Sequence, residues 1–260
     1  MAVVRYNSGV AELAEIVRYT DGYLNIEQCD DWENACNGLQ VENSGKVRRI
    51  GAAVDASTRT FAIAALRGVD LLLVHHGLFW PGLQPITGAF RRQIASLLEH
   101  DIAVYSVHLP LDLHPDVGNN AQLARALGLT EVEPFFEAKG QLIGLRARMQ
   151  IFPNELARKL EESLGSPVRL FPSGPPTTET IGLITGGAGA EIYAVADEGV
   201  DTFITGEAPH WAAIAAQELG INLLLGGHYA TETSGVKALA AHLSERFNLP
   251  WEFLDAPTGL

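Results

Sequence analysis

Hydrophobic and polar positions along the chain follow two periods, that of an amphipathic helix and that of a buried strand. Leu13, Ile16 and Val17 have helical spacing, whereas the run VDLLLVHHG at 69–77 is typical of a buried strand that enters a glycine turn. In the first half we predict strands at 37–41, 48–55, 69–77 and 102–108, and helices at 11–24, 57–68 and 87–100. Strands separated by helices of this length favour parallel pairing, so we predict an α/β fold with three layers, a sheet between two layers of helices.

The second half of the sequence repeats this plan at an offset of 131 residues. Residues 50–70 align with 181–201 without a gap and share six identities in 21 positions, where average composition gives about one or two. A helical pattern at 153–164 corresponds to the opening helix, and the strand INLLLGGH (221–228) corresponds to IAVYSVH (102–108). We therefore predict two similar α/β domains from an internal duplication, covering residues 1–125 and 126–260.

Composition and charge narrow the class of protein. The chain has 47% hydrophobic and 19% charged residues, enough apolar material for a large core, and a formal net charge of −13. Such acidity argues against a nucleic-acid partner, because nucleic-acid binding needs Lys and Arg to displace counterions from phosphates. Cys29 and Cys36 have no CxxC spacing, so neither a disulfide framework nor a thiolate zinc site is indicated. No leader or membrane-spanning pattern is visible, and we expect a cytoplasmic protein.

Two adjacent histidines end a predicted strand. His75 and His76 follow the apolar run LLLV and precede Gly77, at the edge where parallel strands of an α/β sheet open into a ligand crevice. Where the backbone turns at the strand end, both imidazoles can reach one metal or two neighbouring metals. For an isolated histidine pair, core or surface residues are the favoured interpretation, so the metal interpretation depends on further partners.

Such partners follow two other predicted strands. HLPLD supplies His108 and Asp112, and HYATE supplies His228 and Glu232 at the corresponding place in the second half. The i, i+4 spacing puts an imidazole and a carboxylate on one face of a helical turn, although Pro110 favours an extended form for the first copy. Imidazole and carboxylate together suit borderline divalent metals, and a carboxylate can bridge two of them.

The coincidence of these motifs at strand ends of a duplicated unit predicts a metal site between the two halves. Its candidate ligands are His75, His76, Asp112, His228 and Glu232. His108 is a candidate proton carrier or supporting group. In the second half, TGEAPH stands where the histidine pair would be, and its Glu207 and His210 can support the site or cap a helix that begins near Pro209.

A glycine-rich loop, ITGGAGAEI at 184–192, joins a strand to a predicted helix. Such loops cradle phosphate on backbone N–H groups, but Ile192 takes the place of the last glycine of a GxGxxG motif. Tight packing of the strand on the helix is the favoured interpretation of Gly186–Gly189, and a phosphate contact is the alternative.

Together these residues resemble the NIF-three-like family of dinuclear-metal-centre hexameric proteins, whose members are often named GTP cyclohydrolase type homologues. The resemblance is carried, in order, by WENACNGLQV, VHHGLFW, HLPLDLHPDVGNNAQLARALG, TGGAGA, TGEAPHWAAIAAQELG and GGHYATETSGVKALA. HLPLD departs from the HTNLD of many relatives, which keeps the aspartate and changes the loop beside it. The short 126–152 join shows no inserted domain.

The resemblance implies two divalent metal ions held by the five candidate ligands, with Glu232 as the bridge, and a ring-shaped homo-hexamer built as a trimer of dimers. The ligand atoms suit zinc, iron, manganese, cobalt or nickel equally. Two functions remain open. One is a metal-dependent hydrolase that acts on a nucleotide, as in a GTP cyclohydrolase, or on a phosphoester. The other is a non-catalytic metal-binding or regulatory interaction protein.

Overall fold

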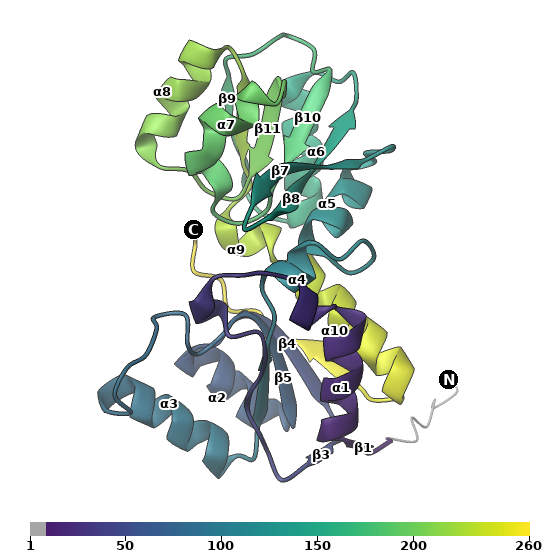
Figure 1. The fold of residues 1–260 in the computed structure, drawn as a ribbon, viewed down its shortest axis with the longest axis vertical. Coiled ribbons are helices and arrows are strands. Elements are labelled where there is room, and N and C mark those ends of the chain that lie inside the picture. The colour runs from purple at the N-terminus through teal and green to yellow at the C-terminus, as the bar shows by residue number, and fades with distance from the viewer. Residues whose placement is uncertain (1–8) are drawn as a thin grey trace. The chain divides into compact units, whose positions relative to one another are not determined.

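The computed structural model describes residues 9–260 and divides into two compact units. The first unit contains the described residues up to Pro110 together with Val236–Ala256, and the second contains Leu111–Gly235 together with Pro257–Leu260. Each unit has its own sheet and is described by itself (Figure 1). The limits 1–125 and 126–260 describe the repeat in the sequence and stay a prediction.

In the first unit, a five-stranded sheet of order β13-β4-β5-β6-β2 is covered on both faces. Strands β13, β4, β5 and β6 run parallel, and β2 joins the edge antiparallel to β6. Helices α2 and α3 lie on one face, and α1 and α10 lie on the other (Figure 1). The elements are β1 (Ala11–Glu12), α1 (Leu13–Tyr23), η1 (Ile26–Gln28), η2 (Glu33–Ala35), β2 (Gly38–Val41), β3 (Lys46–Val47), β4 (Ile50–Asp55), α2 (Thr58–Arg67), β5 (Leu71–His76), α3 (Gly88–Glu99), β6 (Ala103–Ser106), α10 (Thr233–Phe247, from Val236 on) and β13 (Trp251–Phe253).

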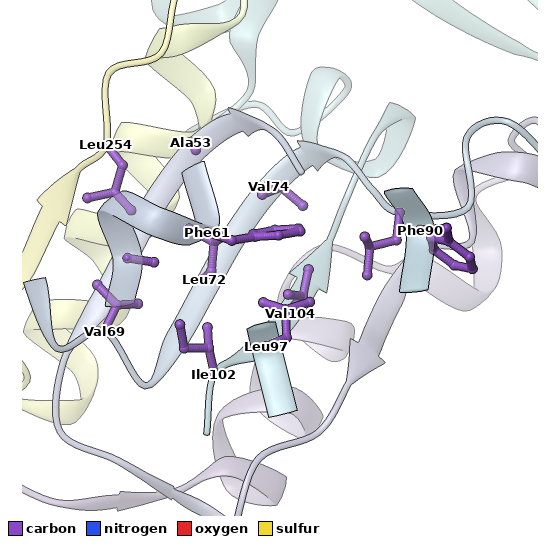
Figure 2. Packing of buried hydrophobic residues seen from close by; sticks show 12 residues of the cluster. Ala53, Phe61, Val69, Leu72, Val74, Phe90, Leu97, Ile102, Val104 and Leu254 are labelled. Atoms are coloured by element: carbon purple, nitrogen blue, oxygen red, sulfur yellow. The ribbon is translucent and has the colours of Figure 1, made fainter. Parts of the chain in front are cut away.

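Local sequence signals define these elements. Ser57 begins α2 with a capping box, in which its side chain accepts from the Thr60 N–H, a contribution of about 1 kcal/mol for such caps. Gly68 ends the same helix with φ +63°, a backbone conformation that only glycine adopts without cost. The apolar face of α2 then places Phe61 on the buried strand residues Leu72 and Val74 (Figure 2).

In the second unit, a six-stranded sheet has the order β7-β8-β10-β11-β12-β9. The three strands β10, β11 and β12 run parallel, and both flanking strands, β8 and β9, are antiparallel to them. Helices α5 and α6 cover one face, and α7 and α8 cover the other (Figure 1). The elements are α5 (Asn119–Leu127), β7 (Glu133–Ala138), β8 (Gln141–Arg148), α6 (Pro153–Leu164), β9 (Arg169–Pro172), β10 (Thr180–Leu183), η3 (Ala188–Glu191), α7 (Ile192–Asp197), β11 (Thr202–Thr205), α8 (His210–Leu219), β12 (Asn222–Leu225) and α9 (His228–Thr231).

The two units share a topology. In each, a helix (α1 or α6) precedes an antiparallel edge strand (β2 or β9), and three parallel strands alternate with two helices. The units differ at the other edge, where β13 extends the first sheet and the hairpin β7–β8 extends the second. The predicted α/β fold of two similar three-layer units is therefore confirmed. The pattern did not predict the antiparallel edges, because their direction depends on how the chain returns to the sheet.

One local expectation was wrong. We expected Pro110 to make HLPLD extended, but Leu109–Asp112 forms the helical turn α4, the counterpart of α9 in the other half. Pro110 is tolerated there since it lies in the first turn of the helix, where a backbone N–H has no partner within the helix. None of the helices within residues 9–260 combines the length and the apolar character needed to cross a membrane.

Candidate metal centre

The first unit gathers three imidazoles at the carboxyl end of its parallel strands. His75 and His76 end β5, and His108 follows the neighbouring strand β6. One ring nitrogen from each lies within 4.8 Å of the other two, close enough to hold a metal ion. His75 is fully buried, and His108 is 9% exposed. The predicted pair is therefore joined by His108, which the sequence suggested only as a supporting group.

Each of these imidazoles is held by an oxygen atom at Nδ1. The partner lies 2.9 Å away in all three cases, and the pairs are His75 with the Val107 carbonyl, His76 with Asp55 and His108 with Asp31. A carbonyl or carboxylate oxygen can only accept, so Nδ1 carries the hydrogen and donates it. Nε2 is then the nitrogen that can coordinate a metal, which is the usual arrangement of histidine ligands in proteins.

Asp31 organises the loop beside His108. One of its oxygens accepts from the His108 ring and the Trp32 N–H, and the other accepts from Asn37 and from the Leu109 N–H. Burial by itself raises the pKa of Asp31, but the hydrogen bond and charge of His108 and the two further donors outweigh it and lower the pKa. The carboxylate is thus charged at neutral pH and keeps electron density on the His108 ring.

The second unit contributes an imidazole between two carboxylates. His228 begins α9 and Glu232 follows that helix, so their i, i+4 spacing brings His228 Nε2 to 3.2 Å from a Glu232 oxygen. On the other side of the ring, Nδ1 lies 3.0 Å from Glu207 Oε1. Glu232 is 3% exposed. The second unit therefore repeats the pattern of the first, with an oxygen at Nδ1 and a potential metal ligand atom at Nε2.

These two carboxylates change the protonation of His228. Burial alone lowers the pKa of an imidazole, but the hydrogen bonds and negative charges of Glu232 and Glu207 outweigh it and raise the pKa of His228 to about 9. At neutral pH without metal, His228 is therefore a cation whose Nε2 proton points at Glu232. A metal ion bound by this nitrogen would have to replace that proton.

The other predicted site residues, Asp112 and His210, belong to the second unit. Asp112 ends α4, where its Oδ1 accepts from the Asn119 amide at 2.8 Å. His210 is exposed at the start of α8, which begins beside Pro209 as the sequence suggested, and Pro209 itself takes the N-cap position. The cap is not made by Glu207, whose carboxylate faces His228. The metal-ligand roles of the five predicted residues stay predictions.

The glycine-rich loop packs against these groups. A Cβ on Gly186 would lie 2.2 Å from Glu232 Oε1, and Gly186 has φ +72°, so only glycine fits. The Gly186 N–H donates to Thr231, and its carbonyl accepts from the N–H groups of Gly206 and Glu207. The loop backbone therefore packs on the TGE segment and on α9 and leaves room for the Glu232 carboxylate, while the predicted packing of the strand on the helix stays a prediction.

Sequence reasoning missed Asp31 and Asp55. Asp55 ends β4 and lies opposite His76 in the register of the parallel strands, so the rule that located His76 could also have located Asp55. Asp31 lies in a loop 77 residues before His108, and no sequence spacing relates the two.

The fold and the clusters together define a duplicated α/β protein with histidines and carboxylates gathered at the carboxyl ends of its strands. The chain belongs to the Duf34/NIF3 (NGG1p interacting factor 3) family, whose profile matches residues 11–258. It is 40% identical over 248 residues to a protein of Deinococcus radiodurans named GTP cyclohydrolase 1 type 2 homolog, with 95% of this chain and 94% of that protein covered.

A second relative with the same name, from Archaeoglobus fulgidus, is 40% identical over 250 residues, and the alignment covers 95% of this chain and 99% of that protein. Among solved structures, TTHA1606 from Thermus thermophilus superposes with a TM-score of 0.88 at 42% identity, covering 96% of this chain and 100% of that chain. The predicted resemblance to this family is confirmed.

The fit of Gly186 against Glu232 gives a first prediction. Gly186→Ala should displace the Glu232 carboxylate and lower the metal content of the purified protein at least about tenfold, in line with losses of supporting groups around metals. Gly199→Ala is the matched control, because Gly199 has a similar φ of +77° and no atom within 4 Å of the added Cβ. Elemental analysis and thermal unfolding of both variants separate metal loss from backbone strain. Equal metal contents in the two variants would refute the packing argument.

The raised pKa of His228 predicts that metal binding competes with a proton. Below its pKa of about 9, His228 must release one proton when metal binds, so affinity should rise about tenfold per pH unit and level off above that pKa. Glu207→Gln removes one of the charges that raise the pKa, and it should move the plateau to lower pH. Equilibrium dialysis of a divalent metal across this range measures both effects, and a pH-independent affinity would contradict the assignment.

Proposed function

We propose that this protein holds two divalent metal ions with His75, His76, Asp112, His228 and Glu232, and that it acts as a metal-dependent hydrolase on a nucleotide or a phosphoester. The ligand atoms are nitrogen and oxygen, which suit zinc, iron, manganese, cobalt or nickel. Glu232 is the proposed bridge between the ions. A homo-hexamer arranged as a trimer of dimers and a cytoplasmic location complete the proposal.

One observation carries the metal assignment, namely that the imidazoles of both units are held in the same way. In each, an oxygen acceptor engages Nδ1 and directs Nε2 away from that acceptor, the arrangement found around metal-ligating histidines. A histidine that only stabilises a core needs no such repeated orientation. The imidazoles of His75 and His76 in the first unit and the buried carboxylate of Glu232 in the second also supply complementary ligand types, neutral nitrogen and anionic oxygen.

When bound, a pair of divalent ions polarises water and substrate oxygens and so supplies a nucleophile near neutral pH. The residues around the ions then have separate tasks. Asp31 and Asp55 hold the rings of His108 and His76 and balance positive charge. We assign His108, beside the two proposed ligands of its unit, the role of proton carrier. Hydrolysis of a nucleotide is supported by the name of the relatives, GTP cyclohydrolase 1 type 2 homolog.

The decisive variant is Glu232→Gln, which keeps the shape of the side chain and removes its charge. We expect metal content to fall at least about tenfold, and hydrolysis of nucleotides or phosphoesters to fall with it, without recovery in excess metal. Glu218→Gln, at an exposed position of α8, is the control. The measurements are elemental analysis and a substrate screen of the metal-loaded protein. A blank screen with full metal occupancy would favour a non-catalytic metal-binding protein, and full occupancy in Glu232→Gln would remove Glu232 from the site.

The proposed assembly makes a separate prediction. Light scattering of the purified protein should give about six times the chain mass of 28.0 kDa, and the value should hold on dilution. A stable species of 28.0 kDa across concentrations would contradict the hexamer without bearing on the metal ligands.

A further inference from the structure

Two tryptophans of the first unit converge on one imidazole of the cluster. The ring of Trp80 lies 4.7 Å from that of His108, and the ring of Trp32 lies 5.5 Å from it. Their planes are inclined to the imidazole by 60° and 67°, so they frame His108 without stacking flat on it. Trp80 also lies 5.4 Å from His76. Although they border a nearly buried cluster, the two residues are 37% and 43% exposed.

The loops that carry both tryptophans border the imidazole cluster. The backbone N–H of Trp32 donates to the Asp31 oxygen that also holds the His108 ring. Trp80 lies in a turn closed by a hydrogen bond from the Gly82 N–H to the Phe79 carbonyl. A Cβ on Gly82 would lie 3.5 Å from the Asn34 side chain, so the turn borders the η2 segment that follows Trp32. The two tryptophans therefore lie on neighbouring loops.

The residues around these indoles favour a ring without negative charge. Residues 29–37 contain Asp30, Asp31 and Glu33 and no lysine or arginine, and residues 77–87 contain no charged residue at all. A phosphate finds no cationic partner on either segment, whereas a neutral planar ring can stack on indole and donate hydrogen bonds to nearby acceptors. Stacking on aromatic side chains is the general way in which proteins bind bases regardless of their sequence.

We propose that Trp32 and Trp80 bind the planar heteroaromatic ring of the substrate beside the imidazole cluster. The inference rests on the proposed function in that the reaction takes place at the metals, and it adds the substrate class and the residues that recognise it. The ring would lie against the two indoles, and any phosphate groups would be left to the metal ions. Of the two substrate types proposed above, the nucleotide is thereby favoured over a simple phosphoester.

The test measures binding of four uncharged nucleosides, adenosine, guanosine, cytidine and uridine, and of inorganic triphosphate to the metal-loaded protein by calorimetry. We expect at least one nucleoside to bind, and Trp32→Leu and Trp80→Leu each to weaken it by about tenfold. Triphosphate affinity should not change in these variants. Trp211→Leu is the matched control, because Trp211 is 44% exposed and stacks on Tyr193 in the second unit. Trp80→Phe keeps an aromatic face and should retain most of the nucleoside affinity.

Several results would overturn the proposal. One is that none of the four nucleosides binds, and another is that both leucine variants bind the nucleoside with unchanged affinity. A third is that the leucine variants change the assembly mass and leave the nucleoside affinity unchanged, which would make the indoles subunit contacts. Metal content is measured for every variant, so the failure of this proposal can be told apart from that of the hydrolase. Hydrolysis that is lost in Glu232→Gln and retained in both leucine variants keeps the hydrolase and removes the ring site. Nucleoside binding that depends on the tryptophans, together with a blank hydrolysis screen, keeps the ring site and removes the hydrolase.

Discussion

The site depends on the parallel pairing of three strands in each unit. Because parallel strands end at the same edge, residues far apart in the sequence meet wherever those strands stop. In the first unit this edge gathers Asp55, the two histidines of β5 and His108. In the second it gathers the TGG and TGE loops with His228. Helices on both faces bury the strands, so the sheet supplies a rigid base for side chains that must hold fixed positions.

The duplication kept the scaffold and changed the chemistry at its edge. The first unit is rich in imidazoles, whereas the second carries Glu207 and Glu232 around a single histidine. In the first unit Gly77, which follows β5, lies close to the Gln40 side chain, and in the second unit Gly186, which follows β10, lies close to Glu232. In both, a glycine allows a polar side chain to approach the backbone at the end of the strand. Imidazole nitrogens in one unit and carboxylate oxygens in the other are ligand types that suit the proposed pair of ions.

The carboxylates that contact the histidines relate the acidic charge of the chain to the binding of metal cations. Asp31 and Asp55 each accept a hydrogen bond from an imidazole of the cluster in the first unit, and Glu207 accepts one from His228 in the second. Each carboxylate orients its ring and contributes negative charge beside it. The net charge of −13 is therefore consistent with a protein that binds divalent cations, and less so with one that binds polyanions through its surface.

The sequence by itself determined the elements, their repeat and most of the candidate ligands. Hydrophobic periodicity and local caps such as Ser57 depend on neighbouring residues, and the HH, HLPLD and HYATE motifs lie at strand ends that the pattern locates. Only the tertiary structure decided which oxygen holds each ring, that HLPLD is helical, and that Gly186 makes room for Glu232. Asp31 and His108 meet because a loop folds across the end of β6, and no local pattern encodes a contact between residues 77 positions apart. Such contacts depend on the packing of the whole unit, which a linear pattern does not specify.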